Sequence, residues 1–185
     1  MSKVYVDAIS HQSSQGSGTI TLGASGETIA LASGASQTMA VNTPAFFAYQ
    51  SSDTAITAST ITKIQFNTED YDVGSCYDST TNYRFTPNVA GKYYIGTMLT
   101  LQGGTSQLIE SRIYIYKNGS VYSYAYQANQ NNYSNYQTNY QAAVISMNGS
   151  SDYIEIFGYI ATSGATSSVL AHTRGTYFQG YKIIE

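Results

Sequence analysis

The sequence predicts an all-β protein, and three observations support that prediction. Thr, Tyr, Ile and Val are abundant, whereas Leu, Glu and Lys, which favour helices, are sparse. Apolar and polar residues alternate with a period of two in several segments, as expected for strands with one buried side. Asn-Gly pairs, typical of tight β-turns, stand at 118–119 and 148–149 between such segments.

The first 43 residues differ from the rest, because they contain almost no aromatic residues after Tyr5. A short pattern recurs in them as TITL at 19–22, TIAL at 28–31 and TMAV at 38–41. Strands this short cannot close a core alone, so we expect a trimer stalk in which identical chains bury one apolar stripe. The alternative is a Gly/Ser-rich linker. The stripe consists of Ile20, Leu22, Ile29, Leu31, Met39 and Val41.

Residues 44–185 form the second predicted domain. Strands are expected at 44–50, 63–66, 83–86 and 92–101, with an acidic turn at 67–74. Pro87 ends one strand because it has no N–H to donate, and Gly91 opens the next. We expect the strands at 83–86 and 92–101 to form a pair around this corner.

The remaining strands follow the same logic. In 108–116, Ile109, Ile113 and Ile115 share one face, while Glu110, Arg112, Tyr114 and Tyr116 share the other. The segment 121–127 returns across the first Asn-Gly pair, and 142–147 and 153–160 form a second predicted hairpin. Strands at 168–172 and 176–184 complete a two-sheet sandwich or jelly roll.

Five segments, in this order, resemble the complement-C1q-like and tumour-necrosis-factor-like jelly-roll family. They are PAFFAY, KIQFNTEDYDVGSCYD, YRFTPNVAGKYYI, IYIYKNGS and TYFQGYKII. The resemblance covers about residues 44–185 and implies an antiparallel jelly-roll sandwich that assembles as a homotrimer. Gly149 and Asp152 depart from the family pattern, which has them adjacent, and the tract 127–141 is longer than expected. The matching signature residues are Phe85, Gly91, Tyr93, Asn118, Gly119, Phe178 and Gly180.

The N-terminal repeats are similar in style to those of bacteriophage fibres, and the start MSKVYVDAIS lacks the apolar core of a signal peptide. We therefore expect a non-enzymatic virion structural protein, either a short fibre or spike tip or a capsid decoration. It would be made in the host cytoplasm and exposed on the particle, with its N-terminal region bound to other virion proteins. The alternative is a free-standing C1q-like lectin or signalling and adhesion module.

Several other functions find no support. The net charge is −3 and the eight Lys and Arg residues are scattered, which argues against nucleic-acid binding. No apolar run is long enough to insert in a membrane. The two histidines, His11 and His172, lie far apart, Cys76 is a lone thiol, and no catalytic or phosphate-binding motif occurs, so no catalytic residue is predicted.

Two sites remain candidates. The acidic stretch offers Asp70 and Asp72, with Glu69 and Asp78 nearby, as oxygen ligands for calcium; the alternative is a solvated turn. The tyrosine-rich region offers a surface for a host saccharide or protein, or for packing between subunits. Its members are Tyr122, Tyr124 and Tyr126 on one strand face and Tyr133, Tyr136 and Tyr140 in the polar loop that follows.

Overall fold

A computed structural model describes residues 44–104, 108–129, 134–163 and 166–183. Within these ranges the chain forms thirteen strands in two antiparallel sheets and no helix. The all-β prediction is therefore confirmed for the described domain. The six stalk residues, from Ile20 to Val41, lie outside the described residues, so the stalk stays a prediction.

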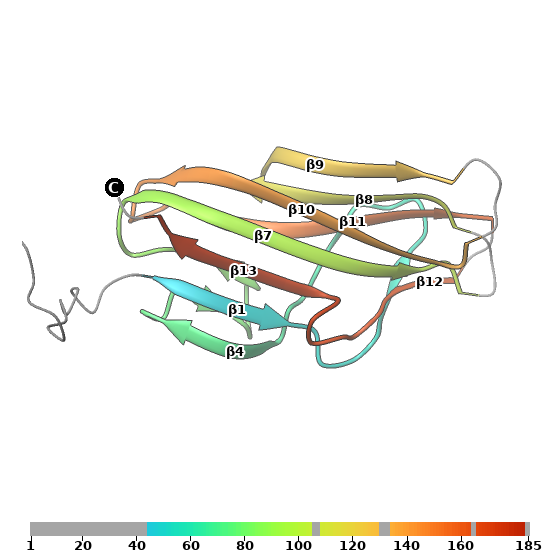
Figure 1. The fold of residues 1–185 in the computed structure, drawn as a ribbon, viewed down its shortest axis with the longest axis horizontal. Coiled ribbons are helices and arrows are strands. Elements are labelled where there is room, and N and C mark those ends of the chain that lie inside the picture. Colours follow the sequence, from blue (N-terminus) through green and yellow to red (C-terminus); the bar gives the residue numbers. More distant parts are fainter. Residues whose placement is uncertain (1–43, 105–107, 130–133, 164–165, 184–185) are drawn as a thin grey trace, which may run out of the picture. The chain divides into compact units, whose positions relative to one another are not determined.

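Sheet A has the strand order β2-β12-β7-β13-β1-β4, and β10 pairs with the other side of β7. Figure 1 shows β10, β7, β13, β1 and β4 side by side in that order. The strands are β1 (Ala45–Tyr49), β2 (Thr54–Thr57), β4 (Thr68–Val73), β7 (Gly91–Gln102), β10 (Tyr136–Met147), β12 (Thr166–Val169) and β13 (Tyr177–Lys182).

Sheet B has the order β5-β6-β11-β8-β9, and the short strand β3 also pairs with β11. Because neighbours in each sheet are mostly distant in sequence, the chain crosses repeatedly between the two layers, as in a jelly roll. The strands are β3 (Thr62–Lys63), β5 (Tyr77–Asp78), β6 (Arg84–Phe85), β8 (Leu108–Lys117), β9 (Ser120–Ala128) and β11 (Ile154–Thr162).

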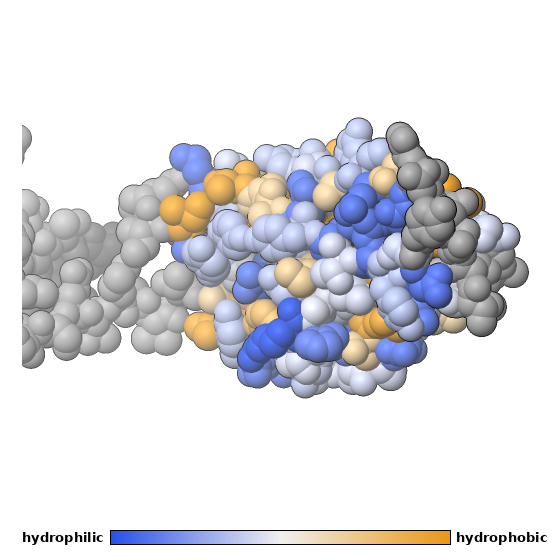
Figure 2. Space-filling model, turned by 45° about the vertical axis from the view of Figure 1, so that its right-hand side comes forward, coloured by the Kyte–Doolittle hydropathy of each residue, from blue (hydrophilic) through white to orange (hydrophobic). Residues whose placement is uncertain are grey.

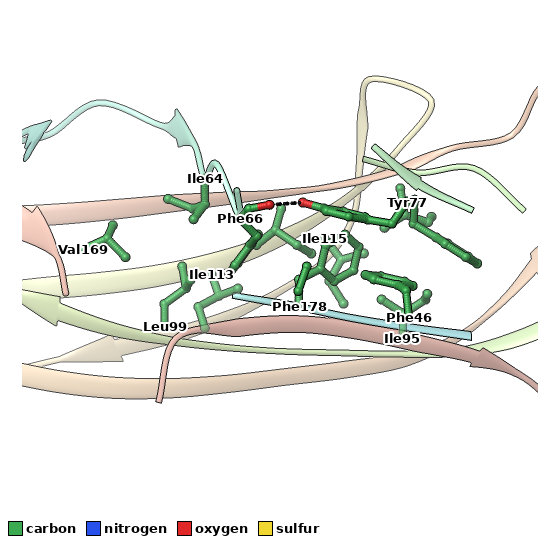
Figure 3. Close-up of a cluster of buried hydrophobic side chains, with 14 of the residues drawn as sticks. Phe46, Ile64, Phe66, Tyr77, Ile95, Leu99, Ile113, Ile115, Val169 and Phe178 are labelled. Atoms are coloured by element: carbon green, nitrogen blue, oxygen red, sulfur yellow. Dashed lines mark hydrogen bonds between the residues drawn. The ribbon is translucent and has the colours of Figure 1, made fainter. Parts of the chain in front are cut away.

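The core lies between the sheets, and Figure 3 shows Phe46 and Tyr77 toward one end of it. The Phe46 ring stacks on Tyr77 at 4.8 Å between centroids and meets the edge of Phe178 at 4.7 Å. The Tyr77 hydroxyl donates to the Phe66 carbonyl at 3.0 Å, which satisfies a polar atom that burial would otherwise leave unpaired. Aromatic residues from both sheets thus hold the sandwich together.

Gly180 shows how tightly the signature residues pack. A Cβ at this position would lie 2.8 Å from Ile95 Cδ1 and 2.9 Å from Phe46 Cε1. The closing strand β13 therefore needs a residue without a side chain next to the buried Phe178.

The segment at 83–95 is a corner between the sheets. β6 belongs to sheet B and β7 to sheet A, so the prediction that these strands pair with each other is wrong. The aromatic residues still meet inside the sandwich: Phe85 and Tyr93 are fully buried, with ring centroids 5.4 Å apart. The Tyr93 hydroxyl donates to the Val89 carbonyl at 2.7 Å, and this hydrogen bond anchors the loop that connects β6 to β7.

The two Asn-Gly pairs have different roles. Asn118 and Gly119 have φ values of 52° and 77° and form the β8–β9 hairpin, as predicted. The second pair connects β10 in sheet A to β11 in sheet B, so the predicted hairpin there is wrong. The Asn148 side chain instead accepts hydrogen bonds from the backbone N–H groups of Ser150, Ser151 and Asp152, each at 3.0 Å, which shapes a wider connection.

Two local predictions also need correction. The acidic stretch at 67–74 contains strand β4, which pairs with β1, and is therefore not a turn. Ile109 is 40% exposed, because the β8–β11 register shifts near this residue and Leu108 takes the buried place. The rest of the predicted alternation holds, since Ile113 and Ile115 are fully buried.

Candidate functional site

The predicted tyrosine site is divided between the two outer faces of the sandwich. Tyr136 and Tyr140 project outward from sheet A, whereas Tyr124 and Tyr126 project outward from sheet B. The prediction that Tyr136 and Tyr140 lie in a loop is wrong, because β10 begins at Tyr136 and pairs with β7 along its whole length. Tyr122 lies at the edge between the faces, where its hydroxyl donates to the Val144 carbonyl at 3.3 Å. Tyr133 lies outside the described residues.

The first surface is the tyrosine face of sheet A. Tyr94 lies at its centre, stacked on Tyr181 at 5.1 Å and hydrogen-bonded through its hydroxyl to the hydroxyl of Tyr140. This hydrogen bond, together with burial, raises the pKa of Tyr94 to about 12. The face consists of Phe47 on β1, Tyr71 on β4, Tyr94 on β7, Tyr136 and Tyr140 on β10, and Tyr177 and Tyr181 on β13.

Gly96 makes the central arrangement of this face possible. A Cβ on Gly96 would approach a Tyr94 ring carbon to 3.1 Å and the hydroxyl oxygens of Tyr94 and Tyr140 to 3.2 Å. The two rings therefore lie over a position where β7 has only backbone. A second group of rings continues toward β4, with Phe47 5.1 Å from Tyr177 and 6.4 Å from Tyr71.

The tyrosine face of sheet A carries little charge. Strands β1, β7, β10 and β13 contain only two charged residues, Lys92 and Lys182, and both lie at the end where β7 begins. At the margin near β4, the Arg174 guanidinium lies 4.6 Å from the Phe47 ring and 3.0 Å from an Asp70 oxygen. An aromatic centre with charges only at its edges is typical of the buried core of a protein interface.

The second surface is the aromatic face of sheet B. Here Tyr116 packs on Phe157 at 4.2 Å, and Tyr114 packs on Tyr124 at 5.8 Å. These pairs come from neighbouring strands, so the register of β8 with β9 and β11 fixes where the rings lie. The face consists of Arg112, Tyr114 and Tyr116 on β8, Tyr124 and Tyr126 on β9, and Phe157 and Tyr159 on β11.

Arg112 is held at the middle of this face. Its guanidinium carbon lies 5.2 Å from the Tyr126 ring centroid and 5.1 Å from that of Tyr159. Arg112 donates to the Tyr114 hydroxyl at 3.2 Å and forms an ion pair with Glu110, and both contacts raise its pKa. Lys63 and Glu155 form a second ion pair at 2.6 Å, so the charges of Arg112 and Lys63 are each balanced by a carboxylate.

Both surfaces share one structural support, a cluster of turn residues around Asp152. The Asp152 carboxylate accepts from the Asn118 amide at 2.8 Å and from the Asn148 backbone N–H at 3.0 Å, and it pairs with Lys117 at 2.9 Å. The hydrogen bond from Asn118 and the contact with Lys117 lower its pKa. The two serines between Gly149 and Asp152 thus place this carboxylate where it joins both Asn-Gly connections.

The acidic residues do not gather around one point. Asp72 accepts from the backbone N–H groups of Cys76 and Tyr77 at 2.9 and 3.2 Å, whereas Asp70 pairs with Arg174. Within the described ranges, no group of three or more His, Cys, Asp or Glu residues is placed to hold a metal ion. The Asp70 and Asp72 carboxylates are engaged by the protein's own donors.

The remaining chemically reactive side chains have structural partners. The Cys76 thiol is buried and donates to Asp72 at 3.1 Å, and burial together with this contact raises its pKa. A thiol with a raised pKa is a poor nucleophile at neutral pH. His172 accepts the Arg174 backbone N–H at its Nδ1 atom, at 3.2 Å. In the part of the chain that the structure describes, no helix is long and apolar enough to cross a membrane.

Most of the two surfaces was not predictable from the sequence. Alternation places Arg112, Tyr114 and Tyr116 on one strand face but does not join them to Phe157 and Tyr159. Their contact depends on the register of β8 with β11, which strand alternation does not reveal. The only available signal was the excess of tyrosine at alternating positions. Figure 2 shows one side of the domain, where weakly polar residues in pale colours cover much of the surface.

No protein-family model matches the sequence, and no curated protein sequence matches it. Solved structures do match. The Eiger TNF structure from S. frugiperda has a TM-score of 0.56 at 8% identity, over 77% of this chain and 92% of that one. Murine APRIL at pH 5.0 has a TM-score of 0.54 at 11% identity, over 76% and 99%.

A third similar structure is the globular domain of zebrafish complement 1qA, with a TM-score of 0.53 at 17% identity, over 77% of this chain and 98% of that one. Identities this low show a shared fold and nothing finer. The described domain has the C1q/TNF-like jelly-roll fold.

Proposed function

We propose that the protein is a non-enzymatic, homotrimeric head, in which the tyrosine face of sheet A is buried between copies. The C1q/TNF-like fold is typically non-catalytic, and members of these families usually form trimers. The tyrosine face of sheet A has the composition that such an interface requires. The aromatic face of sheet B then points outward and is available to other molecules.

The observation that supports this proposal best is the uncharged aromatic centre around Tyr94. The four strands that carry it contain no charged residue except Lys92 and Lys182 at one end. In an isolated chain several of these rings are exposed to solvent, including those of Tyr136, Tyr140 and Tyr181. Burial of the rings against two further copies would remove this apolar area from water and stabilise the assembly.

The proposed trimer also gives the N-terminal region a role. Three copies brought together by their heads would place three Thr-Ile-x-Leu repeat regions close to one axis, where their apolar stripes can pack together. We propose that residues 1–43 attach the head to a virion, as part of a short fibre, spike tip or capsid decoration. The head would then contact a host-surface glycan or protein.

Mass spectrometry of purified virus particles, with electron microscopy of the labelled protein, tests the virion role. We expect the chain to be present at a stoichiometry divisible by three. If particles lack it while the soluble protein still binds cell surfaces, the free-standing lectin or adhesion module is the better description.

Light scattering tests the assembly itself. The full chain should have about three times its mass of 20.0 kDa. The double variant Tyr94→Lys/Tyr181→Lys should fall to the mass of one chain, because buried charges without partners oppose association. Tyr124→Lys, a matched control on sheet B, should remain trimeric. A trimer that survives the double variant would contradict the proposed interface.

A further inference from the structure

We infer that the aromatic face of sheet B is a binding platform for neutral saccharides. The inference rests on the proposed trimer, since that assembly covers sheet A and leaves three copies of this platform outward. Tyr124 and Tyr126 were among the predicted binding residues, but Arg112, Tyr114, Phe157 and Tyr159 were not. The platform therefore keeps two tyrosines of the tract at 122–140 and extends over the neighbouring strands β8 and β11.

The first argument is geometric. The rings come from β11, β8 and β9, which are consecutive strands of one sheet. Tyr114 is paired with both Phe157 and Tyr124, and Arg112 is paired with both Tyr159 and Tyr126. A ladder of this kind places ring rows about 4.8 Å apart from strand to strand. Because the sheet already holds the rings in place, little conformational entropy is lost when a ligand binds to them.

The second argument is exposure. Tyr124 and Tyr126 are 59% and 54% exposed, and they lie on β9, where sheet B ends among the described strands. Their partners Tyr114 and Arg112 pack beneath and beside them. The outer rings thus present accessible surfaces while the inner residues hold them in place. A strand that only needed stability would gain as much from Thr or Val at these positions.

The third argument is charge. Arg112 is paired with Glu110, and Lys63 on the neighbouring strand β3 is paired with Glu155, so the cations closest to the platform already have anionic partners. Arg84, on β6, lies against the Tyr153 ring. A phosphate, nucleic acid or acidic polysaccharide gains little from such a surface, because anion binding needs cations without anionic partners. The best complement to paired charges and tyrosine hydroxyls is a partner that is polar but has no net charge.

A neutral sugar ring fits these three requirements. One side of the ring is lined by C–H groups, which pack against the apolar surface of an aromatic ring, while its hydroxyls point to the edge. Beside these rings lie tyrosine hydroxyls and the Arg112 guanidinium, which donate hydrogen bonds, and the Glu110 carboxylate, which accepts them. Three platforms on one trimer would add avidity on a repeating glycan.

A glycan array that carries both neutral and anionic glycans tests the inference with the full-length protein. We expect binding to one or more neutral glycans. Tyr124→Ser/Tyr126→Ser should weaken that binding about tenfold or more, because two stacking surfaces are lost. Val121→Ser, at a position on the same strand that is 49% exposed, is the control and should bind as the original chain does. Thermal melting should show that both variants fold.

Tyr124→Phe/Tyr126→Phe separates stacking from hydrogen bonding, since it keeps the rings and removes the hydroxyls. This variant should retain most of the binding. Four results would overturn the inference: no neutral glycan bound, binding confined to anionic glycans, equal binding by the double Ser variant, or equal loss in the Phe and Ser variants.

Light scattering of the same samples separates the two proposals. A trimer that binds no neutral glycan would contradict the platform and leave the proposed assembly intact. A single chain that binds neutral glycans through Tyr124 and Tyr126 would support the platform and contradict the assembly.

Discussion

The two outer faces of the sandwich use the same residue type in different surroundings. On sheet A, tyrosines contact one another, through the Tyr94–Tyr140 hydrogen bond and the Tyr94–Tyr181 stack. On sheet B, tyrosines surround Arg112, whose charge is balanced by Glu110. Aromatic content alone therefore does not tell what a surface does. The charged residues around the rings distinguish a face suited to another copy from a face suited to water and a polar ligand.

Hydration explains why this difference matters. Charged pairs at a surface remain partly hydrated, and burying them in an interface costs free energy that their attraction seldom recovers. The paired charges of sheet B therefore disfavour burial against a second copy. The centre of sheet A carries no charged pair, so burying its rings in an interface does not cost this free energy.

Phe178→Ala should have the largest effect on stability, and it should destabilise both sheets at once. The ring packs between the sheets against Phe46, Phe66 and Tyr77, so its loss leaves a cavity at the centre. We expect a loss of about 3–5 kcal/mol in the free energy of unfolding, measured by urea denaturation. A loss below about 1 kcal/mol would show that the two sheets do not depend on this shared core.

Asp152→Asn should have the next largest effect, because Asp152 joins the turn of sheet B to the connection that leaves sheet A. We expect a loss of about 1.5–3 kcal/mol at pH 7, as for a hydrogen-bonded charge. Lys117, Asn118 and Asn148 keep their places in the chain but lose a charged acceptor. An unchanged urea midpoint would show that the connections hold without it.

The same residue gives a pH dependence with a defined sign. The pKa of Asp152 is lowered in the folded protein, and so is that of Asp78, which accepts from the backbone N–H groups of Thr80 and Thr81. Their contributions are complete above the unfolded pKa of about 3.9 and are lost as pH falls through the lowered folded values. The difference in the free energy of unfolding between the original chain and Asp152→Asn should therefore shrink as the pH falls below about 5. A constant difference would contradict this assignment.

Arg112→Gln should have a smaller effect, confined to sheet B. The change removes the cation between Tyr126 and Tyr159 and leaves the Glu110 carboxylate without its ion-pair partner, so we expect a loss of about 0.5–1 kcal/mol in the free energy of unfolding. Light scattering should give an unchanged mass. A change of oligomeric state would show that the aromatic face of sheet B also takes part in assembly.

The smallest effect should be that of salt on the trimer. An interface whose centre has no charge gains nothing from screening, so the mass should be the same at about 0.05 M and 1 M ionic strength. Dissociation at high salt would indicate that charged residues at the margin, such as Arg174 and Asp70, hold the copies together.

Local sequence patterns predicted the strands better than their partners. Alternation located β7, β8, β9 and β13 closely, because side-chain direction is a local property. The Asn-Gly pair at 148–149 correctly indicated a change of direction, but no local signal says which sheet the returning strand joins. Ile109 was misplaced for a similar reason, since the bulge that turns it outward depends on pairing with β11.

The start of β10 was misread because its composition is that of a loop. Gln137 and Asn139 are nevertheless buried, since Ser111 donates to the Gln137 amide oxygen at 2.9 Å and accepts from the Asn139 amide at 2.8 Å. A buried polar network lets a strand rich in Asn and Gln lie in the sandwich. The two surfaces were only partly predictable because residues that are distant in sequence form them.

Hydroxyl-radical footprinting of the full-length chain tests the difference between the two faces most directly. In one chain, Tyr136 and Tyr181 are 55% and 47% exposed, close to the 59% and 54% of Tyr124 and Tyr126. If sheet A is buried between copies, Tyr136 and Tyr181 will be protected while Tyr124 and Tyr126 are oxidised readily. Oxidation of all four at similar rates would contradict the burial of sheet A and, with it, the proposed head.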